Sequence, residues 1–135
     1  MKRFLPLMLF LILLTGFKFT LNAQTLYFCE GVDDKGNPTI ESSVFTIDKA
    51  GGTLYFLTKL PYEVGCNYVN YELFSLDSYS RQSYNTTIKQ DALETTWTYF
   101  WKKITFYEAG TYNVFVYDCS DRILTQSKIT IKFKD

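Results

Sequence analysis

The chain has 135 residues, which predicts a single domain, with 14 basic and 14 acidic side chains and no histidine. The absence of an imidazole argues against Ser-His-Asp and Cys-His nucleophile systems, and against the common zinc and copper sites. The balanced charge, without a large basic cluster, argues against a nucleic-acid partner.

The first segment has the three parts of a cleavable secretory signal peptide. Lys2 and Arg3 precede an apolar run over residues 4–17, and Leu-Asn-Ala at 21–23 resembles the cleavage sites of Gram-negative bacterial signal peptides. The apolar run is shorter than the roughly 20 residues that a membrane-spanning helix needs. We therefore expect residues 1–23 to be removed. The mature chain would then have no transmembrane span and would be periplasmic or secreted.

Cleavage would also change the net charge of the chain. Lys2, Arg3 and Lys18 would be lost, so eleven basic side chains would face fourteen acidic ones and the mature net charge would be −3. This mild negative charge favours solubility and again does not suit a phosphate-binding surface.

Residues 24–135 predict one all-β domain. Aromatic residues make up 19% of the chain, and turn residues interrupt the aromatic and β-branched runs at short intervals, as is typical of β-sandwiches and barrels. No helical period is long enough to cover a sheet, so we expect a two-layer antiparallel β-sandwich of about seven or eight strands. The predicted strands are residues 25–30, 43–48, 53–59, 66–76, 83–89, 96–107, 111–118 and 123–133. The segment 33–38, Asp-Asp-Lys-Gly-Asn-Pro, is predicted as a loop.

Alternation of side chains predicts which face of each strand is buried. In residues 123–133, the odd-numbered side chains from Ile123 to Phe133 are expected to face the core, and the even-numbered ones from Leu124 to Lys132 to face solvent. The same pattern predicts further inward-facing side chains in two other strands: Val69, Tyr71, Leu73, Tyr112, Val114 and Val116.

The segment Glu108-Ala109-Gly110-Thr111-Tyr112 resembles the tyrosine corner of immunoglobulin-like and fibronectin III-like sandwiches, with Tyr112 at the position of the corner tyrosine. Val114 stands where antibody domains carry the second core cysteine, and no tryptophan matches their core tryptophan. These departures argue against an antibody-type domain and leave the wider immunoglobulin-like class. Residues 97–118 are also similar to segments of exported bacterial proteins, a likeness that implies no activity.

The resemblance also implies how the cysteines pair. If the corner sets the strand lettering, residues 66–76 form strand C and residues 111–118 form strand F, which are antiparallel neighbours. Cys66 begins the first and Cys119 follows the second, so the resemblance implies a Cys66–Cys119 disulfide. Cys29 would then be unpaired. It is either a small buried hydrophobe or the site of an intermolecular crosslink.

The strongest candidate binding site is the predicted strand 96–107. Trp97, Tyr99 and Trp101 alternate on one face, and Phe100, Ile104 and Phe106 alternate on the other. If the second set is core, the first is a solvent-facing aromatic stripe suited to sugar rings or to apolar side chains of a partner. The alternative is a bulge near residues 102–103, which would swap the faces and bury both tryptophans.

Carboxylates in the loops are candidate calcium ligands. Glu63, Asp118 and Asp121 are expected at the same pole as Cys66, where calcium could bind, but no Asp-x-Asp-x-Asp run accompanies them. The other interpretation is that they are solvated loop charges.

No catalytic residue, metal site or cofactor motif is predicted. We expect a non-enzymatic module outside the cytoplasm that binds or assembles with a protein. The alternative is a carbohydrate-binding domain that uses Trp97, Tyr99 and Trp101.

Overall fold

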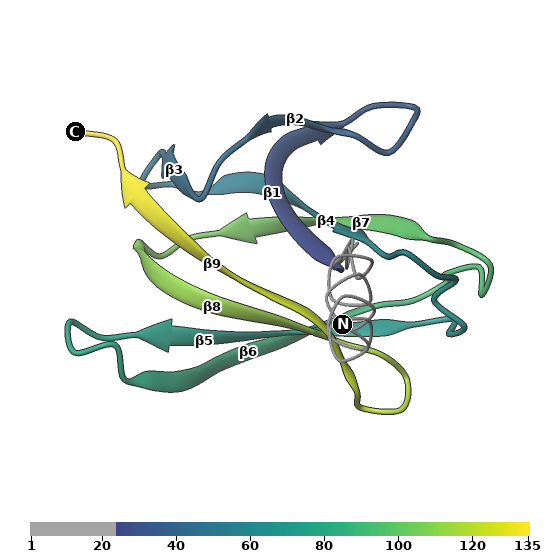
Figure 1. Ribbon diagram of the computed structural model, residues 1–135. Coiled ribbons are helices and arrows are strands. Elements are labelled where there is room, and N and C mark those ends of the chain that lie inside the picture. Colours follow the sequence, from purple (N-terminus) through teal and green to yellow (C-terminus); the bar gives the residue numbers. More distant parts are fainter. Residues whose placement is uncertain (1–23) are drawn as a thin grey trace, which may run out of the picture.

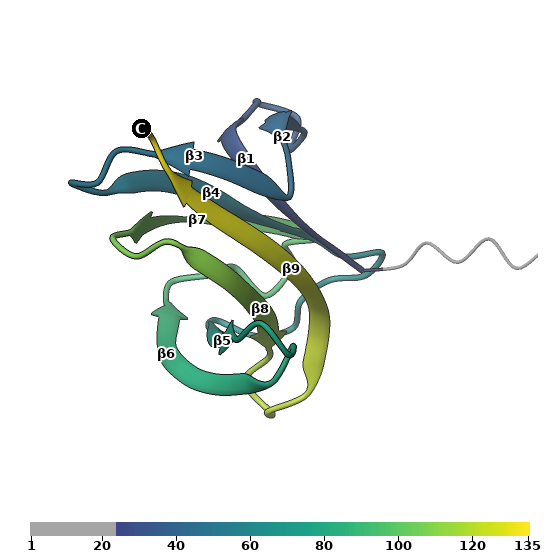
Figure 2. The ribbon, with the colours of Figure 1, turned by 90° about the vertical axis from the view of Figure 1, so that its left-hand side faces the viewer.

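Nine strands form two facing sheets in the computed structural model, which describes residues 24–135 (Figure 1). The strands are β1 (Thr25–Val32), β2 (Pro38–Glu41), β3 (Val44–Ile47), β4 (Gly52–Lys59), β5 (Val69–Leu76), β6 (Gln82–Gln90), β7 (Tyr99–Phe106), β8 (Gly110–Tyr117) and β9 (Ile123–Phe133). The first sheet has the order β2-β1-β4-β7 and the second has the order β3-β9-β8-β5-β6. Figure 2 shows the layers nearly edge-on. The predicted all-β sandwich is confirmed.

The predicted signal peptide, residues 1–23, lies outside the described residues. Within residues 24–135, no helix is long and apolar enough to cross a membrane.

Strand β2 was not predicted, because residues 38–41 follow a strong loop signal and begin with a proline. The strand nevertheless pairs antiparallel with β1, with Cys29 opposite Glu41 and Val32 opposite Pro38. Pro38 is tolerated because it is the first residue of an edge strand, where no ladder hydrogen bond requires its missing N–H.

The expectation of antiparallel pairing throughout is wrong for β3, which pairs parallel with β9 from Val44↔Thr130 to Ile47↔Phe133. The chain changes sheets in the short link before β3. The Ser42 N–H donates to the Phe28 carbonyl, and the Ser42 hydroxyl accepts the Val44 N–H, so this link is held in place. Side-chain alternation predicts which residues form a strand but carries no information on the direction of its partner.

A β-bulge in β9 overturns part of the predicted burial pattern. Tyr117 lies opposite Ile123 and Val116 lies opposite Thr125, so Leu124 is an extra residue on β9. The inserted residue reverses the faces at this end of the strand. Ile123 is therefore 56% exposed and Leu124 is buried, whereas Ile131, beyond the bulge, faces the core as predicted.

The core is centred on Phe56, whose ring centroid lies 4.9 Å from that of Phe28, 5.9 Å from that of Tyr71 and 6.0 Å from that of Phe106. The predicted inward-facing side chains of β5 and β8 are all buried. Tyr112 donates its hydroxyl to the Glu108 carbonyl at 3.1 Å, the bond expected of a tyrosine corner.

The disulfide joins Cys66, before β5, to Cys119, after β8, as the resemblance implied. Cys29 is unpaired and fully buried, with Sγ 3.7 Å from the Tyr55 carbonyl oxygen. Burial raises the pKa of the Cys29 thiol. The position of Cys29 fits a small buried hydrophobe and offers no accessible thiol for the predicted alternative, an intermolecular crosslink.

Three hairpin turns share one five-residue design, which we call the Asp-capped turn. In each, the first residue is an aspartate whose Oδ1 accepts the backbone N–H groups two and four residues later at 2.8–3.0 Å. The fourth residue of each turn has a positive φ. The aspartates are Asp33, Asp77 and Asp118, and the positive-φ residues are Gly36, Ser80 and Asp121.

Acid should destabilise the sandwich through these turns. Backbone hydrogen bonds lower the pKa of Asp33 and Asp77, and at Asp118 desolvation is outweighed by bonds from Arg122 and Ser120, so its pKa is also lowered. A carboxyl with a lowered folded-state pKa stabilises the fold above about pH 4, and that contribution is lost as pH falls through the folded-state pKa.

Urea unfolding followed between about pH 5 and pH 2.5 checks this prediction. The Asp118→Asn variant should lose less stability on acidification than the unaltered chain. Asp34→Asn is the matched control, because Asp34 has no side-chain hydrogen bond among the described residues. An unchanged pH dependence in Asp118→Asn would contradict the assignment.

Candidate functional site

The aromatic stripe predicted on strand 96–107 faces solvent. β7 pairs with β4 along its whole length without a register shift, from Gly52↔Phe106 to Lys59↔Tyr99. Because no bulge interrupts this ladder, the alternative in which the faces swap is wrong. Phe100, Ile104 and Phe106 are buried, whereas Tyr99 is 36% and Trp101 44% exposed.

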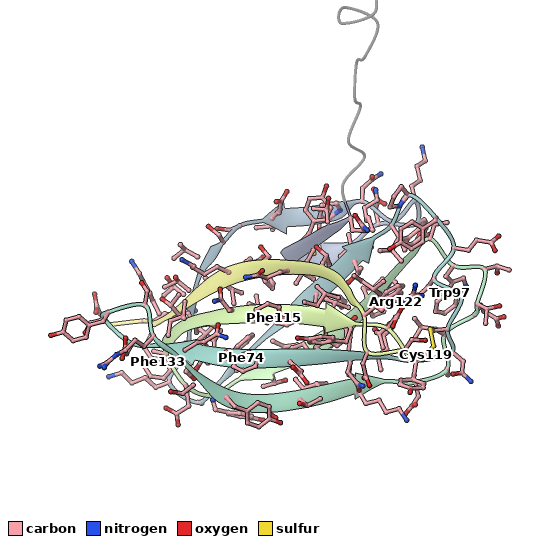
Figure 3. All side chains as sticks on the ribbon, turned by 60° about the horizontal axis from the view of Figure 1, so that its bottom comes forward. Phe74, Trp97, Phe115, Cys119, Arg122 and Phe133 are labelled. Atoms are coloured by element: carbon pink, nitrogen blue, oxygen red, sulfur yellow. A yellow bond between two sulfur atoms is a disulfide. The ribbon has the colours of Figure 1, made fainter. Side chains whose placement is uncertain are left out.

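Trp97 precedes β7 and lies in a turn closed by its N–H and the Glu94 carbonyl, 3.0 Å apart. The observed strand β7 begins at Tyr99, three residues later than predicted. Trp97 is nevertheless 41% exposed. Figure 3 shows it at the same end of the molecule as Cys119 and Arg122.

The three predicted rings line one hollow of about 560 Å³, together with Gln90 of β6 and the remaining residues of 96–101. We call this the aromatic hollow. All of its lining side chains are uncharged, and they combine aromatic rings with one amide and the hydroxyls of Thr96 and Thr98. Such a lining can bind by ring stacking and by hydrogen bonds.

Contacts on the outer face of the sheet hold two of these rings. The Trp101 ring lies 5.3 Å from that of Tyr55, and Lys103 Nζ lies 5.5 Å from the Tyr55 ring on the same face. Tyr99 packs against Gly36 in the β1–β2 turn, where an added Cβ would lie 2.6 Å from the tyrosine ring. With φ of +78°, Gly36 also adopts a conformation that favours glycine.

Gln90 ties the free edges of the two sheets together beside the hollow. Its Oε1 accepts the Tyr71 hydroxyl at 2.6 Å, and its Nε2 donates to the Trp101 carbonyl at 2.8 Å. Tyr71 is fully buried, and burial raises its pKa well above the ordinary value. The amide thus satisfies a buried hydroxyl and holds the backbone at Trp101.

Two of the carboxylates proposed as calcium ligands, Asp118 and Asp121, belong to an Asp-capped turn. Asp118 is occupied by its Asp-capped turn and by an ion pair with Arg122 at 3.2 Å, and Asp121 supplies the positive φ of the same turn. Glu63 and Asp118 line a second hollow of about 570 Å³ beside the disulfide, but Asp121 does not. Within the described part of the chain, no three His, Cys, Asp or Glu side chains converge on a metal site.

A second aromatic cluster, on the outer face of the other sheet, was missed. Its ring centroids lie 5.5–6.3 Å apart, and its members are Phe74, Tyr84, Phe115 and Tyr117. Figure 3 shows Phe74 and Phe115 on this face. Alternation predicts these positions, since Phe74 shares its parity with the outward-facing Glu72. Tyr84 of this cluster is 63% exposed, but only the rings of the stripe share the lining of the aromatic hollow.

No family model matches the chain, and no curated protein matches it significantly. The geometry of the aromatic hollow and of the adjoining sheet edge therefore carries the functional proposal.

Proposed function

We propose that the chain is a non-enzymatic binding or assembly module that acts outside the cytoplasm and holds another protein at the edge of β7. One observation carries the proposal. Trp97, Tyr99 and Trp101 open onto a single hollow beside a strand that has a partner on only one side. Exposed aromatic rings give a large contact area at low entropic cost, and an unpaired edge offers backbone hydrogen bonds to an extended partner.

Two further features support this setting. The Cys66–Cys119 disulfide suits an oxidising compartment. The pairing of β5 with β8, together with the bond from Tyr112 to Glu108, supports an immunoglobulin-like arrangement, in which end loops and edges commonly bind partners.

Carbohydrate binding is the second candidate function. It is favoured by the uncharged lining of the aromatic hollow, where rings stand beside the Gln90 amide and two threonine hydroxyls. Sugar rings stack on aromatic faces and hydrogen-bond with such polar groups.

Site-specific photo-crosslinking in the producing cells tests the first function. A photoreactive residue in place of Thr98, which lines the hollow, should crosslink one discrete protein, and Trp101→Ala should abolish the product. The control position is Gln126, which is exposed on the other sheet. Equal products from both positions would contradict the proposal.

Tryptophan fluorescence titrated with common oligosaccharides separates the two functions. A flat titration is expected for a protein-binding module. A saturable response that Trp101→Ala removes, with the circular-dichroism spectrum unchanged, would replace protein binding by carbohydrate binding.

A further inference from the structure

Lys102 occupies an unusual position on β7. It lies on the inner face of the strand, between Phe100 and Ile104, and is half-buried. No ion pair or side-chain hydrogen bond of Lys102 is found within residues 24–135. The neighbouring Lys103, on the outer face, is placed near the Tyr55 ring. Because the Lys102 ammonium has no such partner among the described residues, a carboxylate brought to it would add a charge-assisted hydrogen bond.

A hollow lies farther along the same edge, although Lys102 itself does not line it. It has a volume of about 170 Å³ and is lined by Ile88 of β6 and by Ile104 and Phe106 of β7, with the acidic Glu108 also in its wall. β6 and β7 each end their sheet, so no strand covers this side of the described sandwich.

The backbone of β7 offers hydrogen bonds along the same side. N–H and C=O groups of successive residues point alternately to the two sides of a strand. Thr98 C=O accepts Leu60 N–H, toward β4, whereas Trp101 C=O accepts the Gln90 side chain, away from β4. The groups of Lys103 and Thr105 share the direction of Trp101 and therefore face the open edge.

Resting on the proposed function, we infer that this edge binds an extended acidic segment of another protein as an added strand. An aspartate or glutamate of that segment pairs with Lys102, and an apolar side chain of the same segment covers the hollow beside Ile104 and Phe106. Backbone groups of Lys103 and Thr105 supply the strand hydrogen bonds, because Gln90 already occupies the Trp101 carbonyl.

Charge disfavours a second copy of this chain as the occupant. If two β7 strands paired antiparallel about Trp101, Lys102 and Lys103 of one copy would lie opposite Phe100 and Tyr99 of the other. The four lysines of the two copies would then lie close together on the paired strands. Pairing about Lys102 would place the two Lys102 ammonium groups directly opposite each other. Inward-pointing lysines on edge strands disfavour such self-pairing, whereas an acidic strand is attracted.

A phage-displayed library of random dodecapeptides, selected against the immobilised chain, tests the inference. The selected peptides should carry an acidic residue between alternating apolar ones. Lys102→Met should weaken their binding about tenfold or more, because it keeps the aliphatic stem and removes the charge. Lys128→Met, on the exposed face of the other sheet, should leave binding unchanged. A parallel selection against Lys102→Glu should yield basic peptides.

Amide hydrogen exchange locates the bound peptide. Addition as a strand should slow exchange at Lys103 and Thr105, whose N–H groups face the open edge, and leave Ile104 unchanged because it is already bonded toward β4. Peptides without acidic preference, or protection elsewhere, would overturn the inference. If the Thr98 crosslink to a partner persists in that case, the proposed function stands and only the acidic-strand inference fails. If that crosslink is also absent, both fail.

Discussion

Replacing Cys66 and Cys119 together by alanine should lower the free energy of unfolding by about 4 kcal/mol. The disulfide closes a loop with a sequence separation of 53 residues and thereby restricts the unfolded chain. The expected loss is a large share of the total stability of a small domain, which is about 5–15 kcal/mol. Urea denaturation followed by tryptophan fluorescence measures the change.

Reduction of the unaltered chain provides the control for this prediction. Reductant should lower its stability by nearly the same amount as the double substitution and should not affect the substituted chain. Cys29→Ala retains the disulfide and should respond to reductant as the unaltered chain does. A loss below about 1 kcal/mol in the double variant would show that the disulfide contributes little.

Gln90→Ala should destabilise the fold by about 1–3 kcal/mol. The substitution removes the acceptor of the buried Tyr71 hydroxyl and the donor to the Trp101 carbonyl, both of which Gln90 holds at hydrogen-bond distance. Leaving a buried hydroxyl without a hydrogen-bond partner destabilises the fold more than removing both partners of the hydrogen bond. Urea denaturation gives the change in free energy, and the tryptophan emission maximum, to which Trp97 and Trp101 both contribute, reports on the surroundings of these rings.

A double-mutant cycle tests whether the cost arises at the Tyr71 hydroxyl. Tyr71→Phe combined with Gln90→Ala should be less destabilising than the sum of the two single changes, because no orphan hydroxyl remains. If the free-energy change of the double variant equals the sum of the two single changes within about 0.3 kcal/mol, the effect of Gln90→Ala does not arise at the Tyr71 hydroxyl.

The alternation of side chains correctly predicted the buried and exposed faces of a strand where that strand pairs with its neighbour without a register shift. β7 runs beside β4 in continuous register, so the exposed stripe of Tyr99 and Trp101 follows from the sequence. In β9, one inserted residue reverses the faces of Ile123 and Leu124. Hydrophobicity alone does not reveal this bulge, because its position depends on the register with β8.

The parts of the site that depend on tertiary pairing could not be predicted. Gln90 and Trp101 meet because β6 and β7 end different sheets on the same side of the sandwich, and no local pattern encodes that meeting. A detectable signal was overlooked in the Asp-capped turns. Asp33, Asp77 and Asp118 each precede an Asn or Arg by four residues, and this repeat marks the turns in the sequence.

The parallel pairing of β3 with β9 has a consequence for the order of folding. It joins residues 44–47 to residues 130–133, and within residues 24–135 β9 is the one strand that pairs with β3. Contacts between such distant segments slow folding, because closing the long intervening loop costs entropy before the contacts stabilise the fold. We therefore expect the β3–β9 pairing to form late in folding, because it requires residues 130–133 to be available.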